Sequence, residues 1–183
     1  MPVANNQLNL NSSIINFRLP SIDGREYSPE DFSDYKVLVI IFMCNHCPYV
    51  QAVISRIVRL QREYEERGVK FIGINSNDSK EYPEDTTEKM KIYYEKWKMN
   101  FPYLRDKSQE VARQYDAVCT PDIYVYDKKR ILKYRGRLDD NWKDESLVTR
   151  QELKEAIESI LEDREVSSEQ NPSMGCSIKW IKN

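Results

Sequence analysis

The feature that most constrains the fold is an unbroken apolar run at residues 36–42 (KVLVIIF). A strand with one solvent-exposed face alternates apolar and polar residues, so a continuous run predicts a strand buried on both faces. A helical stripe follows, with apolar residues at helical spacing from Val50 to Tyr64, and Gly68 ends it. A second apolar run at residues 69–74 (VKFIGI) predicts a second buried strand.

Three further helices are expected, two of them with recognisable starts. Asp85 and Glu88 are spaced as a capping pair before one helical stripe, and Thr149 and Glu152 have the same spacing before the last stripe. A short helix is expected between them, at residues 108–115.

Two antiparallel hairpins are also indicated. Residues 14–27 alternate in polarity around a turn at Asp23-Gly24, which predicts an N-terminal hairpin. Residues 123–126 and 131–134 form a strand–turn–strand pattern. The order of elements therefore predicts an α/β fold, in which a mostly parallel sheet carries an antiparallel hairpin at one edge and is covered by helices.

Length, composition and charge limit the possible domain number, partners and cellular compartment. The chain has 183 residues, which suits one domain, and its net charge of −2 gives no indication of a nucleic-acid or membrane partner. No apolar run approaches the ~20 residues that span a bilayer, and residues 1–11 lack the pattern of a secretory signal. We therefore expect a cytoplasmic protein, in which four cysteines serve redox chemistry or metal binding rather than a disulfide framework.

Two of these cysteines, Cys44 and Cys47, lie where the first strand ends and its helix begins. The unsatisfied N–H groups and the positive end of a helix favour a thiolate there, and Pro48 suits a first helical turn. We expect Cys44 to be the exposed attacking sulfur and Cys47 the more buried sulfur that resolves the mixed disulfide. His46, the single histidine, would favour the thiolate further; the alternative is a solvent-facing loop histidine.

A second feature adds specificity to the CxxC motif. Cys119-Thr120-Pro121 precedes the expected strand at residues 123–126, and an X-Pro bond at such a place can be cis. Because Pro121 has no N–H, the backbone before it is free to pair with an extended substrate chain, so Thr120 and Pro121 are candidate substrate-binding residues. The alternative is an ordinary proline at the start of a strand.

Together these residues resemble the thioredoxin superfamily, and the N-terminal hairpin is similar to that of its peroxiredoxin branch, the alkyl hydroperoxide reductase and thiol-specific antioxidant proteins. A closer resemblance is to a peroxiredoxin-like thioredoxin group, whose pattern shows as MCNHCPYV (43–50), INSND (74–78), FPYLRDKSQEVA (101–112), CTPDIYVYD (119–127), YRGRLDD (134–140) and GCSIKW (175–180). The resemblance implies a thioredoxin-like fold with a central mixed sheet flanked by helices and an N-terminal β-hairpin extension. Residues 1–166 would form this redoxin domain, and residues 167–183 a tail.

The resemblance supports two mechanisms. In the peroxiredoxin signature the peroxidatic cysteine would fall at Cys47, the threonine at Cys44, the proline at Ile40 and the peroxide-binding arginine near Pro121. The sequence departs from that signature at all but the first of these positions, and it carries CxxC and Thr-Pro instead. We therefore favour thiol–disulfide exchange on protein or small-molecule substrates, with a thioredoxin-like electron donor and no cofactor. A thiol-dependent peroxidase using Cys47 is the alternative, and a redox-inactive binding module is the second alternative.

The remaining cysteines are candidate auxiliary redox residues. Cys119 could equally be a small buried packing residue, and Cys176 a tail thiol without a partner. The apolar residues after Cys176 give the tail enough surface to fold back over the active site, where Cys176 could act as a third redox cysteine or bridge to Cys119. Zinc binding would usually require two compact cysteine pairs, and only one is present, so no metal is expected.

Several polar residues are weaker candidates. Asn75, Asn77 and Asp78 follow the second strand at its C-terminal end, where sites in α/β proteins gather, although turn formation is the alternative role. Asp139 and Asp140 form an acidic pair, but such pairs are more often solvated loop charges than acid–base or metal sites.

Overall fold

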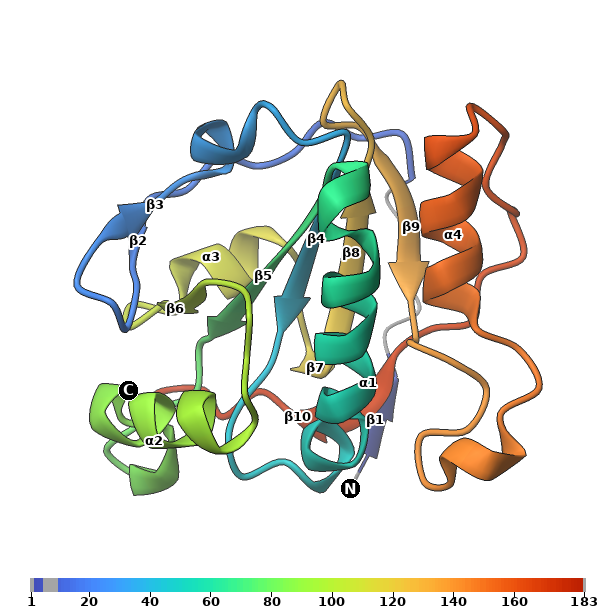
Figure 1. Ribbon diagram of the computed structural model, residues 1–183. Helices are drawn as coiled ribbons and strands as arrows, with labels where there is room; N and C mark the ends of the chain where they lie inside the picture. The colour runs from blue at the N-terminus through green and yellow to red at the C-terminus, as the bar shows by residue number, and fades with distance from the viewer. Residues whose placement is uncertain (1, 5–9, 183) are drawn as a thin grey trace.

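The computed structural model describes residues 2–4 and 10–182 (Figure 1). The strands are β1 (Pro2–Ala4), β2 (Leu19–Pro20), β3 (Glu26–Tyr27), β4 (Val37–Phe42), β5 (Val69–Asn75), β6 (Tyr103–Arg105), β7 (Cys119–Thr120), β8 (Asp122–Tyr126), β9 (Leu132–Gly136) and β10 (Met174–Ser177). The α-helices are α1 (Pro48–Tyr64), α2 (Thr87–Lys96), α3 (Glu110–Gln114) and α4 (Glu152–Leu161). Four short 3₁₀ helices lie at Pro29–Phe32, Glu65–Arg67, Pro83–Asp85 and Glu145–Leu147.

A mixed five-stranded sheet forms the centre of the molecule, in the order β6-β5-β4-β8-β9. Strands β4, β5 and β6 run parallel, and the β8–β9 hairpin joins β4 in the antiparallel sense. The expected sheet with an antiparallel hairpin at one edge is therefore confirmed. The sequence pattern does not indicate β6, because a three-residue strand is too short to show a periodicity.

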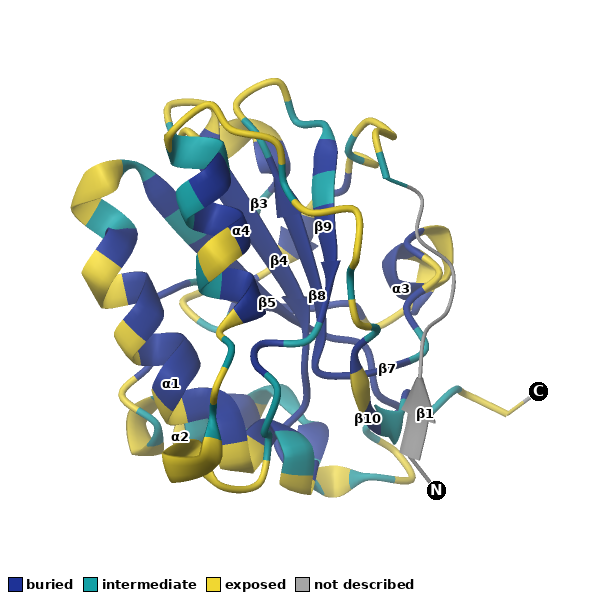
Figure 2. Ribbon diagram, turned by 90° about the vertical axis from the view of Figure 1, so that its right-hand side faces the viewer, coloured by how far each residue is buried: buried dark blue, intermediate teal, exposed yellow. Residues whose placement is uncertain are grey.

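Both faces of this sheet are buried, as the apolar run of β4 requires. Alternate residues of β4 belong to two separate hydrophobic clusters, with Val39 and Ile41 in one and Leu38 and Ile40 in the other. Helices α1 and α4 supply the first cluster, whereas α3 and the N-terminal segment supply the second. In Figure 2 the central strands are buried throughout, and α1 and α4 are buried on the side that faces the sheet.

The two expected capping pairs are both wrong. The N-cap of α2 is Thr86, whose hydroxyl accepts the N–H of Lys89 at 3.4 Å, and Asp85 instead points into the protein. The N-cap of α4 is Gln151, because Thr149 is used in a loop contact with Asp140. In each case the side chain expected to cap the helix instead bonds to a residue elsewhere in the fold, Asp85 to His46 and Thr149 to Asp140.

The N-terminal hairpin is present but short. Strands β2 and β3 pair antiparallel, and Gly24 takes a positive φ of 84° in the turn between them. Together with the central sheet and its helices, this hairpin defines the thioredoxin-like α/β fold with an N-terminal extension. No helix among residues 2–4 and 10–182 is long and apolar enough to cross a membrane.

Candidate active site

The CxxC segment connects β4 to α1, and both of its sulfurs are buried. Helix α1 begins at Pro48, so Cys47 occupies the N-cap position directly before it. Cys44 is only 1% exposed and Cys47 is fully covered. The expectation of an exposed Cys44 is therefore wrong, because this side chain packs into the hydrophobic cluster beneath α1.

The β7 segment lies against both sulfurs. The Thr120–Pro121 peptide bond is cis, and Thr120 is buried beside the CxxC segment. The Sγ of Cys44 lies 3.4 Å from the hydroxyl of Thr120, and the Sγ of Cys47 lies 3.2 Å from its carbonyl oxygen. The structure thus brings together the CxxC and Thr-Pro motifs, which are more than 70 residues apart in the chain.

The pKa values of the two CxxC thiols are shifted in opposite directions. Hydrogen bonding from the Cys44 thiol, then from Thr120, Cys176 and the Val50 N–H, lowers the pKa of Cys47 to about 5 against the effect of burial. The same hydrogen bond to Cys47, together with burial, raises the pKa of Cys44 well above its ordinary value. Burial opposes a thiolate on Cys47, and so does the Thr120 carbonyl, which accepts from the Cys47 thiol; the hydrogen-bond donors outweigh both.

These shifts run opposite to the expected roles, in which Cys44 carries the attacking thiolate. The sequence places both of them near a helix start, but the helix begins one residue after Cys47, so the N-cap position belongs to Cys47. Cys44 lies three residues earlier in the chain, before the helix, and its thiol is the donor to Cys47. The low-pKa sulfur is the second cysteine of the motif.

Cys176 brings a third sulfur to the same place. Strand β10 pairs antiparallel with β7, with Cys176 opposite Thr120. A hydrogen bond joins the Cys176 and Cys47 side chains, and burial together with this bond raises the pKa of Cys176 to about 11. Cys47 is therefore flanked by two thiols, one from the CxxC motif and one from the tail.

Cys119 lies outside this group of three sulfurs. Its thiol is buried and lies near the carbonyl oxygens of Pro121 and Ser173, at 3.9 Å and 3.8 Å. Burial raises the pKa of Cys119 strongly. The residue opposite Cys119 in the β10–β7 ladder is Ser177, so the structure places Cys176 with Cys47 and not with Cys119.

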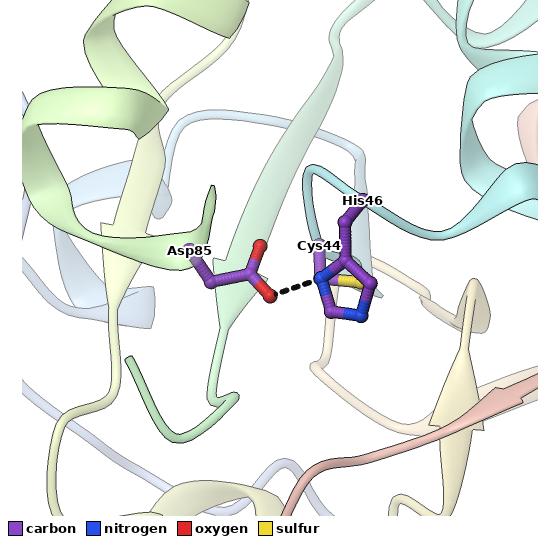
Figure 3. Close-up of side chains that lie close together, drawn as sticks. All are labelled: Cys44, His46 and Asp85. Carbon is purple, nitrogen blue, oxygen red and sulfur yellow. Dashed lines mark hydrogen bonds and ion pairs between the residues drawn. The ribbon is translucent and has the colours of Figure 1, made fainter. Parts of the chain in front are cut away.

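His46 is held by a buried carboxylate. Its Nδ1 lies 2.6 Å from Asp85 (Figure 3). Its ring stacks on Tyr82 with 5.3 Å between the ring centres. The hydrogen bond to Asp85 raises the pKa of His46, against the smaller effect of its partial burial. Burial raises the pKa of Asp85, but hydrogen bonds from His46 and other donors outweigh it and lower the value.

Asp85 is the site residue that sequence reasoning missed. It also accepts the N–H of Asn45 at 2.7 Å and the side-chain amides of Asn77 at 2.8 Å and Asn75 at 3.1 Å. The candidate rim residues Asn75 and Asn77 thus act by holding this carboxylate. Asp85 carried no signal of its own in the sequence, because a polar residue before a helical stripe is expected to be a cap.

The group of Cys44, His46 and Asp85 is the one set of three metal-ligating side chains that the structure gathers within residues 10–182. Their ligand atoms lie within 4.8 Å of one another. A zinc site of the kind weighed from the sequence would need the other cysteines as well, and Cys119 and Cys176 lie outside this group. His46 and Asp85 form an ion pair with each other next to the sulfurs.

These features define the class of protein. A thioredoxin fold with a CxxC segment at the start of α1 and a cis-proline loop against its sulfurs is the arrangement of thiol-based oxidoreductases. Residues 10–135 match the model of the AhpC/TSA family. The chain therefore belongs to the AhpC/TSA family.

Solved structures similar to this one cover the whole chain. An uncharacterized conserved protein from Geobacillus kaustophilus is 41% identical, with a TM-score of 0.94 over 100% of this chain and 98% of that one. A hypothetical protein from Sinorhizobium meliloti 1021 is 34% identical, with a TM-score of 0.94 over 98% of this chain and 99% of that one. The tail is therefore part of a fold that full-length relatives share.

Among curated proteins, the thiol-disulfide oxidoreductase ResA of Halalkalibacterium halodurans is 26% identical over 101 residues. The match covers 55% of this chain and 53% of ResA, so the chain spans about half the length of this relative.

Proposed function

We propose that the chain catalyses thiol–disulfide exchange, with Cys44 and Cys47 as its redox pair and thiols or disulfides of proteins or small molecules as substrates. The observation that carries this proposal is that both sulfurs meet at Thr120 before α1, with the Sγ of Cys44 3.4 Å from its hydroxyl and the Sγ of Cys47 3.2 Å from its carbonyl oxygen. Two cysteines of a CxxC segment held against the same residue are placed to form a disulfide bond. The ResA relative supports the same chemistry.

In the proposed reaction the Cys47 thiolate attacks one sulfur of a substrate disulfide, and the other substrate sulfur leaves as a thiolate. Cys44 then gives its proton to the first substrate thiolate and attacks the Sγ of Cys47, which closes the Cys44–Cys47 disulfide and releases the second substrate thiolate. Two electrons pass from the pair to the substrate. The Thr120 hydroxyl positions Cys44, and His46, whose pKa is raised by its hydrogen bond to Asp85, adds positive charge near the thiolate when it is protonated.

The test is reduction of insulin disulfides with dithiothreitol as the source of electrons. We expect Cys44→Ser and Cys47→Ser each to abolish catalysis, because both sulfurs are needed for turnover. Cys119→Ser is the matched control, since it alters a buried cysteine outside the sulfur group and should keep the activity. A wild-type protein that has free thiols but reduces no disulfide would instead be a binding module.

A peroxidase is the second candidate, favoured by the thiolate on Cys47 and by membership of the AhpC/TSA family. The donors around Cys47 are thiols, a hydroxyl and an amide, all of them neutral. Arg135 is not one of these donors: it pairs with Asp122 and lies over the ring of Tyr124. Peroxide consumption separates the candidates: a peroxidase loses its first turnover in Cys47→Ser and keeps it in Cys44→Ser.

A further inference from the structure

The tail of the chain fills the edge of β7, next to the active-site sulfurs. Strand β10 pairs antiparallel with β7 on one side, placing Cys176 opposite Thr120, and with β1 on the other (Figure 1). This is the backbone segment that the sequence leaves free for an extended substrate chain. The protein therefore carries its own strand in the place of a substrate.

The close approach of β10 to β7 depends on a glycine. A Cβ atom on Gly175 would lie 1.9 Å from the carbonyl oxygen of Thr120, so any side chain at this position would push the strands apart. Just before the strand, the Ser173 hydroxyl donates to the carbonyl of Gly136 at 2.6 Å. The residues around Cys176 are thus fitted to this position.

The residues after Cys176 are also held in place by several contacts. Ile178 is buried in the second hydrophobic cluster. The N–H of Lys179 donates to the side chain of Asn77 at 2.8 Å, and its carbonyl accepts from the Asp78 N–H and the Gln109 side chain, each at 2.8 Å. The strand is therefore held on both sides of Cys176, and displacing it would break many contacts at once.

The docked tail leaves the sulfurs unequally accessible. Cys44, Cys47 and Cys119 are buried, whereas Cys176 is partly exposed. Cys176 also contacts Cys47, which is the sulfur of lowest pKa in the group. Among the four cysteines, Cys176 is therefore the one that a partner at the surface of the docked form can reach most readily.

We infer that Cys176 is a relay cysteine, through which an external thiol reduces the buried Cys44–Cys47 disulfide. This inference rests on the proposed thiol–disulfide exchange. Cys176, as a thiolate, attacks the Sγ of Cys47 and expels the Cys44 thiolate, which forms a Cys47–Cys176 disulfide. An external thiolate then attacks the Sγ of the partly exposed Cys176 and expels the Cys47 thiolate. A second external thiol removes the first as a disulfide and frees Cys176.

Atoms and electrons balance over this cycle. Two external thiols become one disulfide and give two electrons to the pair. One of their protons goes to Cys44, and the other is released because Cys47 stays a thiolate. The second step is favourable for a chemical reason: a thiolate of low pKa is the better leaving group, and Cys47 has the lowest pKa of the three sulfurs.

The first experiment traps the relay disulfide. In Cys44→Ser, limited oxidation with diamide should produce a Cys47–Cys176 disulfide, detected by mass spectrometry of peptides under non-reducing conditions. The matched control Cys44→Ser/Cys119→Ser should form the same bond, and Cys44→Ser/Cys176→Ser should not. Absence of the Cys47–Cys176 peptide pair from oxidised Cys44→Ser would overturn the inference.

The second experiment measures how fast dithiothreitol reduces the oxidised pair. Cys176→Ser should slow this reduction by about tenfold or more, since it removes an attacking group held next to its target. Gly175→Ala keeps every sulfur but moves β10 away from Thr120, so it should also slow the reduction. Unchanged or faster reduction in both variants would show that β10 merely covers the site, and would overturn the relay.

The relay and the proposed function fail in different ways. If wild-type protein never forms a Cys44–Cys47 disulfide on titration with redox buffers, the exchange function fails. If that disulfide forms in Cys176→Ser and is reduced at the wild-type rate, only the relay fails.

Discussion

Replacing Cys44 by alanine tests which sulfur carries the charge. The change removes the S–H group that donates to Cys47 and is the largest cause of its lowered pKa. A hydrogen bond to a charged group contributes about 1.5–3 kcal/mol, and 1.36 kcal/mol corresponds to one pKa unit. Because the lost donor stabilised the deprotonated form, the pKa of Cys47 should rise from about 5 by roughly one to two units.

The assay is a pH titration of the reduced protein, followed by the ultraviolet absorbance of the thiolate. In Cys44→Ala the acidic transition should move upward and keep an amplitude of one thiolate. Cys119→Ala is the matched control, since its sulfur is buried nearby but does not donate to Cys47, and it should leave the transition in place. Cys176→Ala removes a lesser donor and should shift the transition in the same direction by less.

Two results would refute the reasoning. An unchanged transition in Cys44→Ala would mean that Cys44 does not hold the thiolate. An acidic transition that persists in Cys47→Ala would place the charge on Cys44, as in the roles first expected from the sequence.

Three further predictions concern the surroundings of the sulfurs. Asp85→Asn should lower the pKa of His46, followed by NMR of the single histidine, and an unshifted titration would contradict the ion pair. Asp139→Ala breaks a buried ion pair with Arg56 and should cost about 3–5 kcal/mol in urea unfolding, while the thiolate titration stays as in wild type. The pKa of Cys47 is depressed in the folded state, so its stabilising effect is full above the ordinary thiol value of about 8.5 and is lost as the pH falls toward about 5. Between these limits the unfolding free energy of Cys47→Ala should depend less on pH than that of wild type.

The central fold could be predicted from the sequence because its strongest elements are local patterns. The apolar run of β4 and the helical stripe of α1 each specify their structure without help from distant residues. The short strand β6 and the true N-caps of α2 and α4 depend instead on tertiary contacts, such as the one that binds Thr149 to Asp140. Local reasoning has no access to those contacts.

The candidate site likewise has features that follow from the sequence and features that depend on tertiary structure. The position of Cys44 and Cys47 at a strand–helix junction followed from order along the chain. Which of the two carries the charge depends on where the first helical turn begins, and the pattern of apolar residues does not define a boundary that finely. Asp85 reaches His46 from a short 3₁₀ helix about 40 residues away, so no spacing rule could have connected them.

The docked tail bears on both candidate functions. While β10 occupies the edge of β7, an extended peptide cannot form a ladder with Thr120, because the backbone groups on that side are already paired. A peroxide or a small thiol needs no such ladder, and a larger partner needs only to reach the partly exposed Cys176. The docked form therefore selects partners that react without strand pairing, and a protein substrate that requires pairing must first displace a strand anchored on both sides of Cys176.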